Sequence, residues 1–197
     1  MKKPDLLAAL RGVLDVFEQL AIPYYVGGSL ASSAYGLPRT TMDADLVGDV
    51  TLTHVASLVR SLRDRYYVSE AMIARAIADV SSFNLIHLQT TVKIDVFILK
   101  KDAYHRSALA RRVKDRLIDD DPASAVFLSS AEDVILSKLE WYEMGQRVSE
   151  RQWLDVLGII KVQGESLDGE YLVEWSGVLG VSELLRHAYQ EAGVELC

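Results

Sequence analysis

The sequence predicts an α/β protein in which helices flank a sheet and the C-terminal part is helical. In the first half of the chain, apolar residues at helical spacing alternate with short runs rich in β-branched and aromatic residues. Two of these runs, residues 83–88 and 92–99, are separated by three polar residues, which indicates an antiparallel hairpin. From Ser130 onward the apolar residues follow helical spacing. We therefore expect a core over residues 1–101 and, packed on it, a lobe over residues 102–197 that contains a hairpin and helices.

The individual elements follow from apolar spacing and from the residues that begin or end helices. An apolar stripe over residues 5–20 predicts a packing helix, and Pro23 ends it because proline has no N–H to donate. A strand over residues 24–26 leads through a Gly-Gly-Ser turn into a short helix over residues 29–35. The same reasoning predicts a strand at 42–47, a helix at 53–65, an extended segment at 66–68, a helix at 70–79 capped by Ser69, a helix at 102–110, a hairpin of 112–118 with 123–128, helices opened by Ser130 and Ser149, and helices at 168–179 and 182–192.

Composition places the chain among soluble globular proteins. The 197 residues are 50% hydrophobic and 25% charged, and a net charge of −7 disfavours binding of long nucleic acids by overall charge. The only cysteine is Cys197, which excludes an intrachain disulfide. Arg11, Asp15 and Glu18 interrupt the first apolar run, and no stretch approaches the ~18 uncharged residues of a membrane span. We therefore expect a cytoplasmic protein with no membrane partner.

Two aspartates one residue apart mark the strand at 42–47 as a candidate metal site. Because side chains alternate along a strand, Asp43 and Asp45 share one face while Ala44 and Leu46 point into the core. Parallel carboxylates suit a hard cation such as Mg²⁺. The alternative is that Asp43 caps a turn and Asp45 is merely exposed. The same alternation puts Asp95 opposite its apolar neighbours, so it reaches the same metal if the two strands are adjacent.

The Gly27-Gly28-Ser29 turn is a candidate phosphate site. Glycines allow the backbone to approach a phosphate closely, and the helix start behind them offers N–H groups at a positive dipole end. A plain strand-to-helix turn with Ser29 as N-cap would give the same pattern. Its position just before the aspartate pair favours phosphate binding by the backbone N–H groups and the Ser29 hydroxyl.

Taken in order, Gly-Gly-Ser, a spacer of 13 residues, Asp43-Ala-Asp45-Leu and Lys93-Ile-Asp95-Val-Phe-Ile resemble the hallmark of the nucleotidyltransferase fold, shared with polymerase-β-like enzymes. The resemblance covers about the first hundred residues. It implies a mixed sheet and two Mg²⁺ ions, which Mn²⁺ can replace. It also implies that Asp43 and Asp45 bridge the ions, while Asp95 binds the second ion and accepts the nucleophile's proton.

The later half resembles the small bacterial nucleotidyltransferases that include abortive-infection toxins. Arg39 opens a run that is similar to their Arg-x-Thr-x-Asp-x-Asp pattern. By the same resemblance Lys138, on an apolar helix face, contacts the nucleotide's phosphates, and Asp155 on the following helix lines the site. The alternatives are an ion pair of Arg39 with Asp43, and a snorkelling Lys138 paired with Glu132 or Asp155.

A basic run follows the core. It could dock tRNA or another acidic acceptor, or it could be a solvated face, and no aromatic residue interleaves with it in sequence. The four histidines show no zinc-type spacing. The run consists of Arg106, Arg111, Arg112, Lys114 and Arg116.

The sequence thus supports a Mg²⁺-dependent nucleotidyltransferase that moves a nucleoside monophosphate from an NTP to a hydroxyl. The acceptor is left open between a small molecule, a protein and a tRNA. The family resemblance implies one biological setting, the toxin of a toxin–antitoxin pair with an antitoxin protein as its partner. The first alternative is a non-catalytic module of the same fold that binds a nucleotide or a partner. The second is an antitoxin or structural partner whose acidic strand serves assembly.

Overall fold

The computed structural model describes residues 3–117 and 124–196, and the chain packs into two compact units. The first unit comprises Met1–Gly27 and Thr40–Leu128, and the second comprises Gly28–Arg39 and Ser129–Cys197. Neither unit is therefore a continuous piece of the chain. The sequence analysis placed its division at residue 101, whereas residues 102–128 pack here with the first unit and residues 28–39 with the second.

The first unit is built on a mixed sheet, as the motifs implied. Among the described residues, seven strands pair in the order β3-β4-β5-β2-β1-β7-β6. The β2–β5 and β1–β7 pairs are parallel, and the other neighbours are antiparallel. Both predicted hairpins form, although the turn predicted at 119–122 lies outside the described residues. The strands are β1 (Tyr24–Val26), β2 (Asp43–Gly48), β3 (Tyr66–Tyr67), β4 (Ser82–His87), β5 (Lys93–Ile98), β6 (Val113–Arg116) and β7 (Ala125–Leu128).

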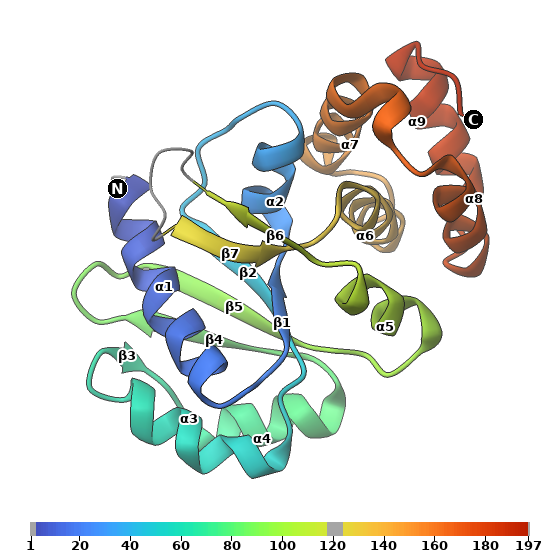
Figure 1. Cartoon of the computed structure of the whole chain (residues 1–197). Coiled ribbons are helices and arrows are strands. Elements are labelled where there is room, and N and C mark those ends of the chain that lie inside the picture. The colour runs from blue at the N-terminus through green and yellow to red at the C-terminus, as the bar shows by residue number, and fades with distance from the viewer. Residues whose placement is uncertain (1–2, 118–123, 197) are drawn as a thin grey trace. The chain divides into compact units, whose positions relative to one another are not determined.

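Helices cover one face of this sheet. Figure 1 shows α1, α3 and α4 gathered along it, and these helices pack on one another and on β2 and β4. The helix predicted at 53–65 begins with a 3₁₀ turn, and its α-helical part ends at Leu62. Helix α4 begins after Ser69, whose hydroxyl accepts from the N–H of Met72. The elements of this unit are α1 (Lys3–Gln19), η1 (Leu52–His54), α3 (Val55–Leu62), α4 (Glu70–Asp79) and α5 (Ala103–Ala110).

The alternation of β2 decides which face carries chemistry. Ala44 and Leu46 are buried on the helix-covered face. A Cβ on Gly48, which shares that face, would come within 2.7 Å of the Phe17 ring of α1. The aspartates of β2 consequently point to the opposite face, because successive side chains of a strand alternate.

The second unit is helical, as predicted. The short helix α2 packs on α6 and α7, α6 also contacts α8, and α9 contacts α7 and α8. The approach to α7 is close at Gly36, where a Cβ would lie 3.0 Å from the backbone nitrogen of Ile159. Figure 1 draws α6 to α9 in brown to red. The elements are α2 (Gly28–Tyr35), α6 (Ala131–Met144), α7 (Glu150–Gln163), η3 (Gly164–Ser166), α8 (Gly169–Val178) and α9 (Ser182–Ala192).

Serine caps and buried hydrogen bonds fix the helices of the second unit. Ser130 and Ser149 cap α6 and α7, as expected from the sequence. Asp133, almost fully buried, accepts hydrogen bonds from the hydroxyls of Ser130 at 2.8 Å and Tyr171 at 2.9 Å. Among the residues that the structure describes, no helix has the length and apolarity needed to cross a membrane.

Candidate functional site

Three carboxylates lie on the face of the first unit's sheet that is opposite to α1, α3 and α4. Strands β2 and β5 are parallel neighbours, with Asp45 directly opposite Asp95 and Asp43 opposite Lys93. The condition set by the sequence, that the two strands lie side by side, is therefore met. Asp45 and Asp95 are half-buried and Asp43 is exposed. We call this group the carboxylate face; it consists of Asp43, Asp45, Asp95 and Lys93.

Lys93 is the cation of this face, and the sequence analysis did not assign it a role. Its Nζ lies 2.8 Å from Oδ2 of Asp95. The hydrogen bond that the Lys93 ammonium donates to Asp95 raises the pKa of the Lys93 amine; burial opposes this, and the charges of Asp95, Asp43 and Asp45 add to it. One ammonium is thus stabilised by all three acids. Lys93 and Asp95 are two residues apart on one strand, so strand alternation alone could have predicted that they share a face.

Gly27, the first residue of the glycine turn, is hydrogen-bonded to the backbone of β2. The N–H of Gly27 donates to the carbonyl of Asp45 at 2.9 Å. The hydroxyl of Thr41 donates to Oδ1 of Asp43 at 2.8 Å, so a turn hydrogen bond does engage Asp43, as the simpler alternative expected. Gly28 has a φ of +54°, a conformation that favours glycine. The N–H of Gly27 is engaged in the sheet, so N–H donation to a phosphate would come from the residues after it.

A second cluster lies within the second unit and centres on Asp155 of α7. Its carboxylate accepts from Nζ of Lys138 at 2.7 Å and from Nε and Nη2 of Arg39, both at 3.1 Å. Arg39 Nη2 also donates to the hydroxyl of Ser29. The hydroxyl of Ser32 donates to Asp155 at 3.4 Å, and Nζ of Lys138 donates to the side-chain oxygen of Gln152 at 3.1 Å. We call this group the Asp155 cluster; it consists of Ser29, Ser32, Arg39, Lys138, Gln152 and Asp155.

The Asp155 cluster is buried and cation-rich. Lys138 is 5% exposed, so it does not snorkel to solvent, and the Asp155 side chain is 9% exposed. Burial alone would raise the pKa of the Asp155 carboxyl, but hydrogen bonds and charge from Arg39 and Lys138 outweigh it and hold that pKa below its ordinary value. The sequence analysis named Asp155 as one alternative partner of Lys138, but it did not predict the pairing of Arg39 with Asp155. It missed Ser32 and Gln152, which no motif distinguishes.

The carboxylate face has the donor atoms that a divalent metal needs, although they are not grouped around one point. As oriented here, and within the described residues, no three His, Cys, Asp or Glu side chains are grouped to hold a metal ion. The donor chemistry nevertheless fits a hard cation, because carboxylates from three positions share one face and already stabilise the ammonium of Lys93. The role of Asp43, Asp45 and Asp95 as Mg²⁺ ligands stays a prediction from the sequence.

The basic run lies partly on the edge strand β6. Each residue of β6 is exposed, and the strand pairs only with β7 among the described residues. The guanidinium of Arg112 lies 4.8 Å from the ring centroid of Phe127, and Nζ of Lys114 lies 5.9 Å from it. Phe127 comes from β7, directly opposite Lys114, so the aromatic partner absent from the run in sequence is supplied by strand pairing.

No family model and no curated protein matches the chain. Solved structures do match. The solution structure of the antibiotic-resistance factor ANT(2″)-Ia is similar with a TM-score of 0.55 and 15% identity, covering 94% of each chain. The crystal structure of ANT(2″)-Ia in complex with adenylyl-2″-tobramycin matches with a TM-score of 0.55 and 12% identity over 88% of this chain and 95% of that chain. An antigenic nucleotidyltransferase-like protein from Paracoccidioides brasiliensis matches with a TM-score of 0.51 and 18% identity over 94% and 93%.

The chain therefore has the nucleotidyltransferase fold, as the ordered motifs predicted. At identities of 12% to 18% the likeness is one of fold. What the protein does has to be argued from the carboxylate face and the Asp155 cluster themselves.

Proposed function

We propose that this protein is a Mg²⁺-dependent nucleotidyltransferase that moves a nucleoside monophosphate from an NTP to a hydroxyl acceptor. The observation that carries the proposal is the parallel register of β2 and β5, which sets Asp45 opposite Asp95 with Asp43 two residues away on the same face. A purely structural role does not explain three acids on one face, because carboxylates held together repel one another unless a cation neutralises them.

Each acid has a distinct role in the proposal. Asp43, Asp45 and Asp95 would hold the divalent ions, and Asp95 would also accept the proton of the acceptor hydroxyl. Mg²⁺, or Mn²⁺ in its place, would neutralise the triphosphate and lower the pKa of that hydroxyl. The acceptor oxygen forms a bond to the α-phosphorus, the bond from that phosphorus to the bridging oxygen breaks, and pyrophosphate leaves with the electron pair.

Within the second unit, Arg39 and Lys138 are the proposed phosphate ligands. Guanidinium and ammonium groups bind phosphate oxygens by charge-assisted hydrogen bonds. Asp155 holds both side chains in place, so that their orientation does not have to be fixed when the nucleotide binds. Gly28 and Ser29, at the start of α2, contribute backbone N–H groups and a hydroxyl.

The decisive experiment is nucleotidyl transfer with α-labelled NTPs. Purified protein is incubated with each NTP, Mg²⁺ or Mn²⁺, and three acceptor pools: small hydroxyl compounds, protein and tRNA. ATP is the first NTP to test, since ANT(2″)-Ia was crystallised with an adenylylated product. Label should appear in one pool together with released pyrophosphate, and Asp43→Ala should abolish both. Equal labelling by wild type and Asp43→Ala would refute the role of the acids.

A non-catalytic binding module is the second candidate, and one observation favours it. The charged groups proposed for catalysis are paired with one another: Lys93 with Asp95, and both Arg39 and Lys138 with Asp155. Calorimetry separates the two functions. A binding module shows saturable NTP binding without pyrophosphate release in the presence of all acceptor pools.

The toxin setting is tested in cells. If the acceptor is an essential protein or tRNA, induced expression of wild type should arrest growth, and Asp45→Asn should relieve the arrest. Co-expression of an antitoxin protein would restore growth with wild type. Unimpaired growth at high expression of active enzyme would leave a small molecule as the acceptor.

A further inference from the structure

Lys93 occupies a position that the pleat of β5 dictates. Ile94, between Lys93 and Asp95, is completely buried, so both charged side chains must lie on the face opposite to Ile94. Across the sheet Lys93 faces Asp43 in β2. A cation is thereby fixed among the three acids by the strand register.

The charges of the carboxylate face do not balance. Three aspartates carry three negative charges against the single positive charge of Lys93. The Lys93 ammonium lies 2.8 Å from Asp95, and Lys93 stands directly across the sheet from Asp43. A divalent cation bound by the acids would neutralise the face more fully, and it would need the same Asp95 oxygens.

We propose that Lys93 is a built-in counter-ion, which holds Asp95 when no divalent cation is bound and competes with that cation for it. This inference rests on the proposed function, because it takes the three acids as the metal ligands. Lys93 is thus a positioning residue. It keeps Asp95 oriented on the sheet face, and it lowers the affinity for a metal that arrives without a nucleotide.

The geometry allows Lys93 to leave. Its side chain is 48% exposed, compared with 18% for Asp95, and a four-carbon stem can carry the ammonium into water. Half-exposed ion pairs contribute little to stability, so their rupture is not a large barrier. The alternative is that Lys93 is an ordinary surface lysine whose pairing has no bearing on the metal.

The test is a direct metal titration without nucleotide, read as free Mn²⁺ by electron paramagnetic resonance. We compare wild type with Lys93→Met, Lys93→Gln and Lys93→Arg. Removing the competing charge should tighten Mn²⁺ binding about tenfold in the Met and Gln variants, because both the competing bond and the repulsion between like charges disappear. Lys93→Arg keeps the cation and should bind Mn²⁺ like wild type.

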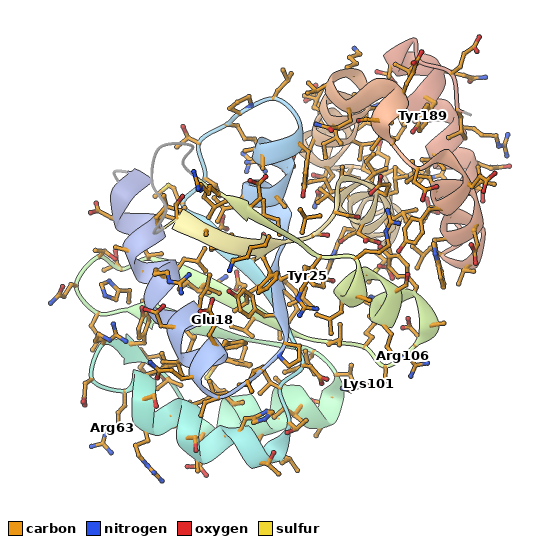
Figure 2. The ribbon with its side chains drawn as sticks, viewed as in Figure 1. Glu18, Tyr25, Arg63, Lys101, Arg106 and Tyr189 are labelled. Atoms are coloured by element: carbon orange, nitrogen blue, oxygen red, sulfur yellow. The ribbon has the colours of Figure 1, made fainter. Side chains whose placement is uncertain are left out.

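Lys101→Met is the matched control. Lys101 also pairs with an aspartate of the same unit, Asp49, but it follows the far end of β5 (Figure 2). Its loss changes the net charge by the same amount, so Mn²⁺ affinity should stay at the wild-type value if the effect is local.

A second readout is thermal unfolding with and without Mg²⁺. Without metal, Lys93→Met removes the ammonium that pairs with Asp95, so its melting temperature should fall, and Mg²⁺ should raise it by more than it raises wild type. Wild type that binds Mn²⁺ while the Met and Gln variants bind it no more tightly would overturn the inference about Lys93 alone. Failure of every variant to bind Mn²⁺ would overturn both this inference and the metal role in the proposed function.

Discussion

The carboxylate face and the Asp155 cluster have opposite charge, and the Asp155 cluster is the more deeply buried of the two. On the carboxylate face three acids share one half-exposed lysine, whereas in the Asp155 cluster one buried acid serves two cations. The carboxylate face therefore has an excess of negative charge, which suits a metal ion. The Asp155 cluster has an excess of positive charge, which suits a phosphate. The degree of burial determines whether a substitution in each group affects ligand binding alone or folding as well. Changes on the exposed face should affect ligands and activity, and changes in the buried cluster should also affect folding.

The largest expected effect is on activity. Asp45→Asn removes a charge from the centre of the carboxylate face while keeping its shape, so NMP transfer should fall by about a thousandfold or more. The free energy of unfolding should change little, because a half-exposed carboxylate among like charges contributes little to stability. Initial rates with a labelled NTP and urea unfolding measure the two. Loss of activity caused by misfolding would appear as a lower urea midpoint.

Asp155→Ala, in contrast, should lower the free energy of unfolding substantially. It leaves Lys138 buried at 5% exposure without this carboxylate, and breaking a buried ion pair costs about 3–5 kcal/mol. Urea unfolding gives the value directly. Glu143→Ala, which breaks the exposed pair with Arg147 in the same unit, is the control and should leave the midpoint unchanged. Similar urea midpoints for Asp155→Ala and Glu143→Ala would mean that burial does not make the Asp155 ion pairs more important for stability than an exposed pair.

Replacing the lysine instead of the acid sharpens the comparison. Lys138→Met preserves most of the buried volume and leaves Asp155 paired with Arg39, so the cost in stability should be smaller than for Asp155→Ala. NTP affinity should fall about tenfold, the value of one lost charge-assisted hydrogen bond. Isothermal titration without acceptor measures it. Unchanged affinity would remove Lys138 from the phosphate ligands.

The smallest effect is a dependence of stability on pH. The pKa of Asp155 lies below its ordinary value of 3.8, so on acidification the unfolded chain takes up the proton first. The stabilisation is thus complete above the ordinary pKa and is lost as the pH falls through the lower, folded-state pKa. Urea midpoints between about pH 3 and 6 should fall more steeply for wild type than for Asp155→Asn. Parallel curves would contradict the pairing.

Local pattern was enough to predict much of the fold. The two-residue alternation in Asp43-Ala-Asp45-Leu46 and around Asp95 correctly assigned the faces of β2 and β5, because strand geometry alone sets it. The caps Ser69, Ser130 and Ser149 also formed as expected, since an N-cap depends on residues only three positions apart.

The remaining features depend on contacts between distant parts of the chain. The sequence could state that Asp95 joins the other acids if β2 and β5 are neighbours, but only the topology made them so. The choice of Asp155 as partner for both Arg39 and Lys138 is set by the packing of α2, α6 and α7. Lys93 is different, because its position two residues before Asp95 was visible in the strand pattern and its partner lies on the same strand.

The discontinuity of the two units has a consequence for how the protein is made and dissected. Ser29 and Arg39 are synthesised long before Lys138 and Asp155. The hydrogen bonds of the Asp155 cluster therefore cannot form until α6 and α7 have also been synthesised. A fragment cut at Ser129 would carry the acid without its arginine, and a fragment ending at Leu128 would carry the arginine without its acid. Genetic truncation cannot therefore separate the two units; only a permuted chain with new termini could test each of them alone.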